Sequence, residues 1–220
     1  MGNKALIAPQ NGHIGIELHW NGGRDSINAF LEYGRLAGLP PLGKNDSGIF
    51  NFVTVLVNFF GNDGHNVYPV AIPQSLPELE QLNPGDNGIY IVDGWKIIKR
   101  LCKPTFEQRD HDLDEMLKAI DAAQPARDKL GPYLDAEEAP VEQIKIGDQI
   151  VIRDNLNHET KTQTYPVVAF GENLKINGTN VFGLPHFIRY NDGINGKPEL
   201  NINNYAKGPT VHRLTQTNQN

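Results

Sequence analysis

The chain has 220 residues, a formal net charge of −6 and 39% hydrophobic residues, a composition typical of an ordinary globular protein. The acidic balance argues against a nucleic-acid polymer as partner, because proteins that bind the phosphate backbone usually carry a basic stripe. It remains compatible with a small anion held by a few amides and arginines. The single cysteine, Cys102, excludes an intramolecular disulfide and a cysteine-based zinc cluster.

The sequence carries no signal for a membrane or a cofactor. It shows no basic-then-apolar leader, and no apolar run approaches the roughly 20 residues that span a bilayer. Cys102 ends the apolar stretch "IIKRLC" and is expected to be a structural thiol rather than a nucleophile. We therefore expect a cytoplasmic protein without a membrane partner and without a cofactor.

Alternating apolar residues and turn signals predict an α+β domain of β-hairpins and helices over residues 1–123. In chain order we expect a hairpin of strands 4–9 and 13–20, helices at 26–37 and 49–60, an edge strand at 66–72, a short helix at 75–82, a hairpin at 87–101 and a helix at 110–124. The segment 49–60 also suits a strand, but its length favours a buried helix. The alternation in strand 13–20 places Trp20 on the core side with Ile16 and Leu18.

The composition and residue pattern of the sequence change after this domain. Residues 124–140 are rich in proline, charge and small side chains, and we interpret them as a linker. From residue 141 onward, short apolar segments alternate with turn residues. This pattern predicts a small antiparallel β-barrel or sandwich-like domain over 141–214. The last residues, 215–220, are expected to form a tail.

The motif most suggestive of binding is "HWNGGRDS" at residues 19–26, where a predicted strand meets a predicted helix. The turn Asn21–Gly23 suits positive φ angles and can present its amides to an anion. The helix that follows adds N-terminal amides and a positive dipole end, and Arg24 can bind a phosphate in bidentate fashion. The alternative is a plain corner in which Asp25 or Ser26 caps the helix and Arg24 is solvated.

Aromatic and basic residues elsewhere extend this candidate site. Trp20 or Tyr33 can stack on a base, and His19 lies beside the turn. In the C-terminal domain, Arg189 and Tyr190 either close over a ligand or belong to an exposed hairpin. The candidate ligand-binding residues are His19, Trp20, Asn21, Gly22, Gly23, Arg24, Tyr33, Arg189 and Tyr190.

Neither a metal site nor a common hydrolase site is expected. His13 and His19 lie on one face of a strand but about 20 Å apart at ~3.3 Å per residue, and Glu17 adds only one further ligand beside His19. The acidic cluster "DHDLDE" at 110–115 is expected to stabilise the start of a helix through the helix dipole. No G-x-S-x-G elbow is present.

The segments "ELHWNGGRDSINAFLEY" and "GIYIVDGWKIIKR" resemble a group of small uncharacterised proteins of bacteriophages and of mobile elements of Gram-positive bacteria. The resemblance extends to about Arg100. It implies a biological context for the protein but no particular chemical activity. Small acidic phage proteins without catalytic motifs often act against host defences. Some of them are compact oligomers that sequester nucleotide immune signals.

Three functions are compatible with these features. The leading hypothesis is a non-enzymatic anti-defence protein in the host cytoplasm, a homo-oligomer that sequesters a small phosphorylated signal such as a cyclic nucleotide or an ADP-ribose derivative. The second is an enzyme that degrades a nucleotide or another phosphodiester, with His19 and Glu17 as acid and base. The third is a protein that inhibits a host factor by direct contact.

Overall fold

The structure of the chain is a computed structural model that describes residues 3–43, 46, 48–61, 65–105, 111–140, 143–145, 147–154, 161–171, 187–190, 199–201 and 210–214. The chain divides into two compact units, residues 1–129 and 130–220. The division lies inside the range 124–140 that the sequence predicted as a linker. The predicted tail at 215–220 and all of the sequence at 172–186 lie outside the described residues.

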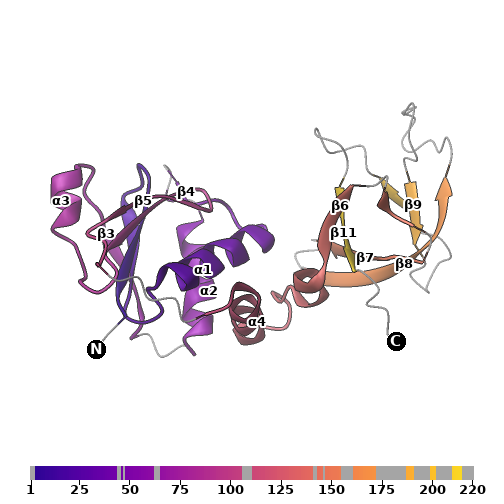
Figure 1. The fold of residues 1–220 in the computed structure, drawn as a ribbon, viewed down its shortest axis with the longest axis horizontal. Coiled ribbons are helices and arrows are strands. Elements are labelled where there is room, and N and C mark those ends of the chain that lie inside the picture. The colour runs from indigo at the N-terminus through magenta and orange to yellow at the C-terminus, as the bar shows by residue number, and fades with distance from the viewer. Residues whose placement is uncertain are drawn as a thin grey trace. The chain divides into compact units, whose positions relative to one another are not determined.

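The N-terminal unit is an α+β domain with a mixed five-stranded sheet and four helices (Figure 1), as the sequence predicted. Its strands lie in the order β3-β2-β1-β4-β5. The strands are β1 (Ala5–Pro9), β2 (Ile14–Leu18), β3 (Val67–Ala71), β4 (Ile89–Asp93) and β5 (Lys96–Leu101). The helices are α1 (Arg24–Leu36), α2 (Ile49–Phe59), α3 (Leu76–Glu80) and α4 (Leu113–Ala123). The segment 49–60 is thus a helix rather than a strand, and β3 is the expected edge strand.

The register of the sheet divides its apolar side chains between two faces. Strands β1 and β4 pair in parallel, with Leu6 opposite Ile89 and Ala8 opposite Ile91. These four residues are buried together with Leu79 of α3. Because side chains alternate along a strand, the intervening residues of β1 and β4 point to the opposite face. Figure 1 shows α3 on one side of the sheet and α1, α2 and α4 on the other.

The helices on the second face are joined by packing and by buried hydrogen bonds. The indole of Trp95, in the β4–β5 turn, makes an edge-on contact with Phe52 of α2 at 5.6 Å between ring centroids. It also lies so close to Gly34 of α1 that a Cβ there would stand 2.5 Å from Cζ3 of Trp95. At the end of α4, Gln124 is 5% exposed and donates to the carbonyl oxygen of Val55 in α2. Residue 124, predicted as the start of the linker, therefore belongs to the core of the first unit.

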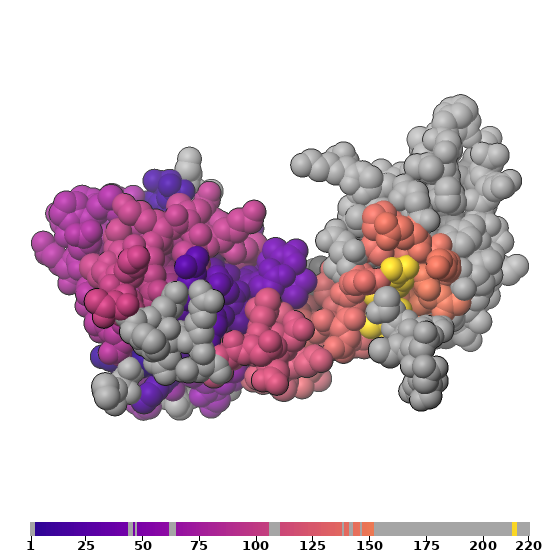
Figure 2. Space-filling view, in the orientation of Figure 1, coloured from indigo at the N-terminus to yellow at the C-terminus, as the bar shows by residue number. Residues whose placement is uncertain are grey.

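Segments distant in sequence interleave in this unit. Figure 2 shows the indigo surface of the first part of the chain against the magenta surface of later segments. The N-terminal segment is held at both ends of β1. The amide of Lys4 donates to the Asp86 carboxylate at 3.0 Å, and the amide of Gln10 donates to the carbonyl oxygen of Val92 at 2.7 Å.

The turn before β2 is held by a carboxylate. Oδ1 of Asp46 accepts hydrogen bonds from the amides of His13 (2.8 Å) and Ile14 (3.1 Å), and Oδ2 lies 3.4 Å from Nδ1 of His13. Although desolvation acts in the opposite direction, these two backbone donors and the His13 ring hold the pKa of Asp46 below its ordinary value of 3.8. Asp46 has a positive φ of 48°, which aspartate tolerates better than most residues.

The prediction that Trp20 faces the core is wrong. Strand β2 ends at Leu18, so the alternation stops before residue 20, and Trp20 is 51% exposed. Leu18 and Ile16 are fully buried, as expected. The short strand leaves the indole of Trp20 on the surface of the N-terminal unit.

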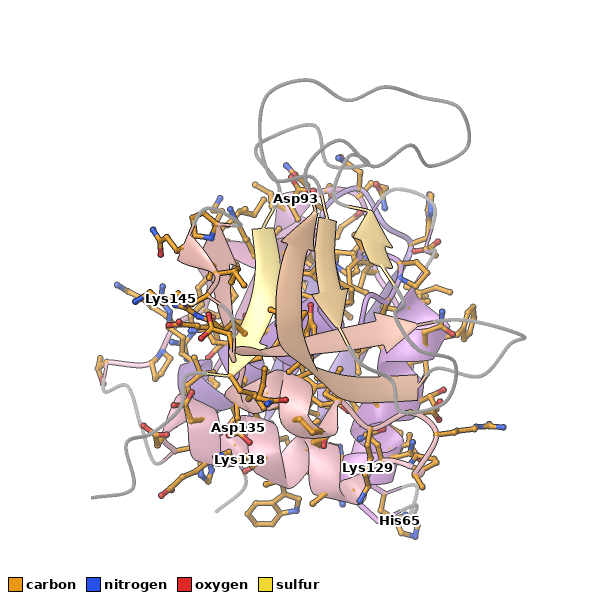
Figure 3. All side chains as sticks on the ribbon, turned by 90° about the vertical axis from the view of Figure 1, so that its right-hand side faces the viewer. His65, Asp93, Lys118, Lys129, Asp135 and Lys145 are labelled. Atoms are coloured by element: carbon orange, nitrogen blue, oxygen red, sulfur yellow. The ribbon has the colours of Figure 1, made fainter. Side chains whose placement is uncertain are left out.

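The second unit contains a short 3-10 helix and antiparallel strand pairs. Its elements are η1 (Gly131–Asp135), β6 (Glu137–Pro140), β7 (Gln149–Asp154), β8 (Lys161–Gly171), β9 (Phe187–Tyr190), β10 (Glu199–Asn201) and β11 (Thr210–Leu214). Strands β7 and β8 form a hairpin. Both η1, whose Asp135 is labelled in Figure 3, and β6 lie in the range predicted as a linker.

Arg213 joins three segments of the second unit. Its guanidinium donates to the Glu137 carboxylate of β6, to the carbonyl oxygen of Gln143 at 3.0 Å and to the Asp148 carboxylate at 3.4 Å. The hydrogen bonds to Glu137 and Asp148 raise the pKa of Arg213 above its ordinary value, against the effect of desolvation.

Across the part of the chain that the structure describes, none of the helices is both long enough and apolar enough to cross a membrane.

Candidate functional site

A cationic pocket lies along β5 in the N-terminal unit. Its volume is about 480 Å³, within the usual range for small-molecule sites. The lining residues are Arg24, Tyr90, Ile97, Ile98, Lys99, Arg100, Lys103, Pro104 and Thr105. Four of these side chains are cationic at neutral pH, and no carboxylate stands among these lining residues of the described chain. We call this site the cationic pocket.

Arg100 is held in a fixed position within the pocket. Its Nε donates to the carbonyl oxygen of Asn87 at 2.9 Å, and its Nη2 lies 3.3 Å from Oδ1 of the same residue. Its Cζ lies 4.5 Å from the ring centroid of Tyr90, which is a cation–π contact. Asn87 is itself only 5% exposed and donates to the Asn3 side chain. The guanidinium therefore needs little reordering to meet an anion.

Tyr90 connects the cationic pocket to the "NGG" turn. Its side chain is completely buried, and its hydroxyl donates to the carbonyl oxygen of Gly22 at 3.1 Å. Arg24 follows that turn as the first residue of α1, and its exposed side chain reaches the pocket from there. Arg24 is thus the predicted site residue that the structure brings to the pocket.

The glycines of the predicted anion cradle have another role. The amide of Gly22 donates to the carbonyl oxygen of Asn3 at 2.8 Å, so it is not turned toward a ligand. A Cβ at Gly22 would stand 2.6 Å from that same oxygen, and only glycine fits against the start of β1. Gly23 is the N-cap of α1 with φ −59°, and Asn21 alone in this turn has a positive φ, of 54°. The predicted cradle is wrong for Gly22, because the close approach of β1 consumes its donor.

The side-chain cap of the alternative interpretation, a plain corner capped by Asp25 or Ser26, is also absent. The structure gives the helix no side-chain cap at its N-terminus, and Asp25 accepts a hydrogen bond from the amide of His111 at 2.8 Å instead. Oγ of Ser26 is buried and has no hydrogen-bond partner in the described structure. Asp25 thus connects α1 to the segment before α4 instead of capping its own helix.

His19 belongs to a surface cluster formed by the ends of β2 and β3. Its Nε2 lies 3.4 Å from Oε1 of Glu17, and its ring makes a tilted contact with that of Tyr68 at 4.7 Å between centroids. The Tyr68 hydroxyl donates to the carbonyl oxygen of His65, which is labelled in Figure 3. Neither His19 nor the exposed Trp20 is among the lining residues of the cationic pocket in the described structure.

The structure removes Tyr33 from the candidate site. Tyr33 is 1% exposed, and its hydroxyl donates to Oδ1 of Asp121 in α4 at 2.8 Å. A ring enclosed in this way cannot stack on a ligand base. Tyr33 lies on the helical face that packs against α4, so its aromatic ring serves the core.

Arg189 and Tyr190 occupy the end of β9 in the second unit. Arg189 pairs with Ala169 of β8 and with Glu199 of β10, and Tyr190 pairs with Val167. Their position in an antiparallel pairing suits the alternative of a hairpin with two faces. Their role toward a ligand stays a prediction.

The acidic cluster at the start of α4 has a structural role. Oδ1 of Asp112 accepts from the amides of Asp114 (2.9 Å) and Glu115 (3.2 Å), which makes Asp112 the N-cap of the helix. Asp110 lies outside the described residues. Within the described ranges no group of three or more histidine, cysteine, aspartate or glutamate side chains is placed to hold a metal ion.

Sequence reasoning missed Lys99, Arg100 and Lys103 as site residues. The signal was the stretch "KIIKRLCK", which concentrates cations along one strand of an acidic chain. Cys102, at the end of this stretch, was expected to be a buried or half-buried structural thiol, but it is exposed and has a positive φ of 50°. A basic segment on a predicted edge strand, close to a predicted helix N-terminus, is the sequence pattern from which the pocket could have been predicted.

Fold and site together define a two-unit protein whose N-terminal α+β unit carries a cationic pocket at a sheet edge. Comparison with protein-family models, curated proteins and solved structures found no match to this chain.

Proposed function

We propose that the protein binds and sequesters a small phosphorylated ligand in the cationic pocket. The observation that carries this proposal is that four cationic residues line one pocket, with no carboxylate among the lining residues that the structure describes, in a chain whose net charge is −6. An acidic protein that gathers cations around one cavity favours an anionic ligand there. The proposed ligand is a nucleotide signal, such as a cyclic nucleotide or an ADP-ribose derivative.

The geometry of Arg100 supports binding of phosphate. The Arg100 guanidinium is already oriented by Asn87 and by the Tyr90 ring, so it loses little conformational entropy when it contacts a phosphate oxygen. Arg24 supplies a second guanidinium from the first turn of α1, where the helix dipole favours negative charge. Neither guanidinium supplies a nucleophile, which favours binding of the ligand without chemical conversion.

The biological setting is part of the same proposal. We infer from the resemblance of the N-terminal segments that this is a phage-type protein that acts against a host defence in the host cytoplasm. The second unit is proposed to close into a small β-barrel or sandwich, and to form the contacts of a homo-oligomer. Sequestration requires tight binding and enough binding sites to match the number of signal molecules. An oligomer with several pockets would provide these sites.

The test is recovery of ligand from the full-length protein. The protein is incubated with a panel of cyclic mononucleotides, cyclic dinucleotides and ADP-ribose derivatives, separated from free ligand, heated, and the released molecule is identified by chromatography. We expect at least one phosphorylated ligand to be recovered intact. Lys99→Ala and Lys103→Ala should each weaken that binding, whereas Lys96→Ala, on the same strand but outside the lining residues, should bind as the parent does.

Two other outcomes contradict sequestration, and a third changes the assignment of the site. A ligand recovered in altered form would favour the enzyme, for which His19 and Glu17, 3.4 Å apart, are the acid and base to substitute. Failure to bind any phosphorylated compound in the panel would favour direct inhibition of a host protein. Equal binding by Arg24→Ala and the parent would remove Arg24 from the site.

A further inference from the structure

We propose that α2 is an interface for a second copy of this chain, with the α2 helices of the two copies packed against each other. This inference goes beyond the proposed binding of a ligand, because none of the described lining residues of the cationic pocket belongs to α2. It follows from an apolar stripe on the outer side of α2, from the spacing of that stripe and from the absence of charge along the helix.

One side of α2 belongs to the core of the N-terminal unit. Phe52 contacts the Trp95 indole, and the carbonyl oxygen of Val55 accepts a hydrogen bond from Gln124 at the end of α4. The buried residues of the helix are Ile49, Phe52, Val55 and Leu56. These contacts fix the helix in place and leave its opposite side outside the core.

The opposite side carries an apolar stripe, which we define as Phe50, Val53 and Val57. Phe50 is 66% exposed, the highest value among the exposed large hydrophobic residues that the structure describes, and Val53 and Val57 are half-buried. Single apolar side chains on a surface are common and need no partner. A row of them along one helix is different, because covering the row stabilises a complex by about 25 cal/mol per Å² of apolar surface.

The spacing of the apolar stripe is typical of a seam between two helices. Its members are three and four residues apart, and Phe60, three residues further on, is half-buried against Phe30 of α1. Apolar residues at alternating intervals of three and four form the narrow line along which helices pack in a coiled coil. The stripe therefore fits another helix better than it fits a flat surface.

The charge of α2 favours a second copy of the same helix as the partner. None of the residues of α2 (Ile49–Phe59) is charged. A two-fold interface brings the same surface of both copies together, so a charged stripe would repel itself, whereas an uncharged stripe does not. A strongly acidic or basic partner would find no opposite charge along this helix.

The test is analytical ultracentrifugation of the full-length protein over a range of concentrations. We expect the parent to associate reversibly. Phe50→Lys should raise the dissociation constant at least about tenfold, because it removes an aromatic contact and places like charges in the seam. Asn51→Lys is the matched control and should associate as the parent does, because it adds the same charge at an exposed position of the same helix outside the stripe.

A second measurement does not depend on the size of the particle. Phe50→Cys, made in a Cys102→Ser background, should react with a maleimide more slowly in concentrated than in dilute protein, since association covers position 50. Asn51→Cys should react at the same rate at both concentrations. Phe50 and Asn51 are exposed, so the variants should remain folded, and circular dichroism verifies this.

Three outcomes would overturn the inference. A parent that stays monomeric, with Phe50→Cys open to the maleimide, leaves the apolar stripe to a different protein. A monomeric parent in which Phe50→Cys is protected shows that the same chain covers the stripe. An oligomer that Phe50→Lys does not weaken is held by other contacts. None of these results affects binding in the cationic pocket, which fails only if no phosphorylated ligand binds.

Discussion

The hydroxyl of Tyr33 donates a buried hydrogen bond to Oδ1 of Asp121, and this bond joins α1 to α4 across 88 residues of sequence. Tyr33 is 1% and Asp121 7% exposed, so water does not readily replace the bond. It attaches the last helix of the N-terminal unit to the helix that carries Arg24.

Tyr33→Phe should lower the free energy of unfolding by about 1–3 kcal/mol, because it removes a buried donor from a carboxylate and leaves the ring in place. Urea denaturation should show a lower midpoint with an unchanged slope. Binding of a phosphorylated ligand should persist in the folded variant. If Tyr33→Phe is as stable as the parent but no longer binds the ligand, Tyr33 belongs to the binding site after all.

Ser26→Ala should raise the stability of the N-terminal unit by about 1 kcal/mol. Oγ of Ser26 is buried without a partner in the described structure, and an unsatisfied buried hydroxyl costs free energy that the methyl group does not. Asn28→Ala, an exposed position of the same helix, controls for helix propensity. A destabilised Ser26→Ala variant would show that the hydroxyl makes a favourable contact.

Gly34→Ala should destabilise the protein although alanine is the better helix former. The added Cβ would meet the Trp95 indole at 2.5 Å, and the overpacking should cost about 1–3 kcal/mol. In a Trp95→Ala background the same substitution should become neutral or stabilising by up to about 1 kcal/mol. The double-mutant cycle measures this change of sign, and additive effects would exclude the clash.

The stability contributed by Asp46 should depend on pH. Since its pKa is lower in the folded than in the unfolded chain, the ionised carboxylate stabilises the fold above its ordinary pKa of 3.8, and this contribution is lost as the pH falls through the lowered value. The stability difference between the parent and Asp46→Asn should therefore shrink as the pH falls below about pH 4. A difference that does not change with pH would contradict the role of the charge.

A paired substitution separates charge from hydrogen bonding at the same position. Asp46→Asn keeps an acceptor for His13 and Ile14 and tolerates the positive φ. Asp46→Ala loses both and should cost about 1–2 kcal/mol more. Chemical denaturation of the two variants at neutral pH checks this order.

The elements of the N-terminal unit were predictable because each has a local signature. The Asn11-Gly12 and Asp93-Gly94 turns define two hairpins, and Pro69 marks the edge strand. The exposure of Trp20 was not predictable, because the residue at which a strand ends depends on the neighbouring strands. Here β3 pairs with β2 only from Ile14 to Leu18. The linker was misplaced for a related reason, since Gln124 is fixed by contacts with α2.

The site was predictable only in part. Arg24 was found from its place after a glycine turn, but the partners that make the pocket come from β5 and the segment after it. Their proximity depends on the register of β4 and β5 and on Tyr90, which reaches the "NGG" turn through a bond across 68 residues. Periodicity along the chain carries no information about such contacts.

The parallel pairing of β1 with β4 also has a consequence for the order of folding during synthesis. Hairpin β1–β2 can form as soon as it emerges, but the other edge of β1 has no partner until β4 has been made. During that interval an apolar central strand presents unsatisfied backbone groups to the cell. Nascent chains halted before Ile89 should therefore be prone to aggregate, whereas chains that include β5 should bury the strand and become resistant to protease.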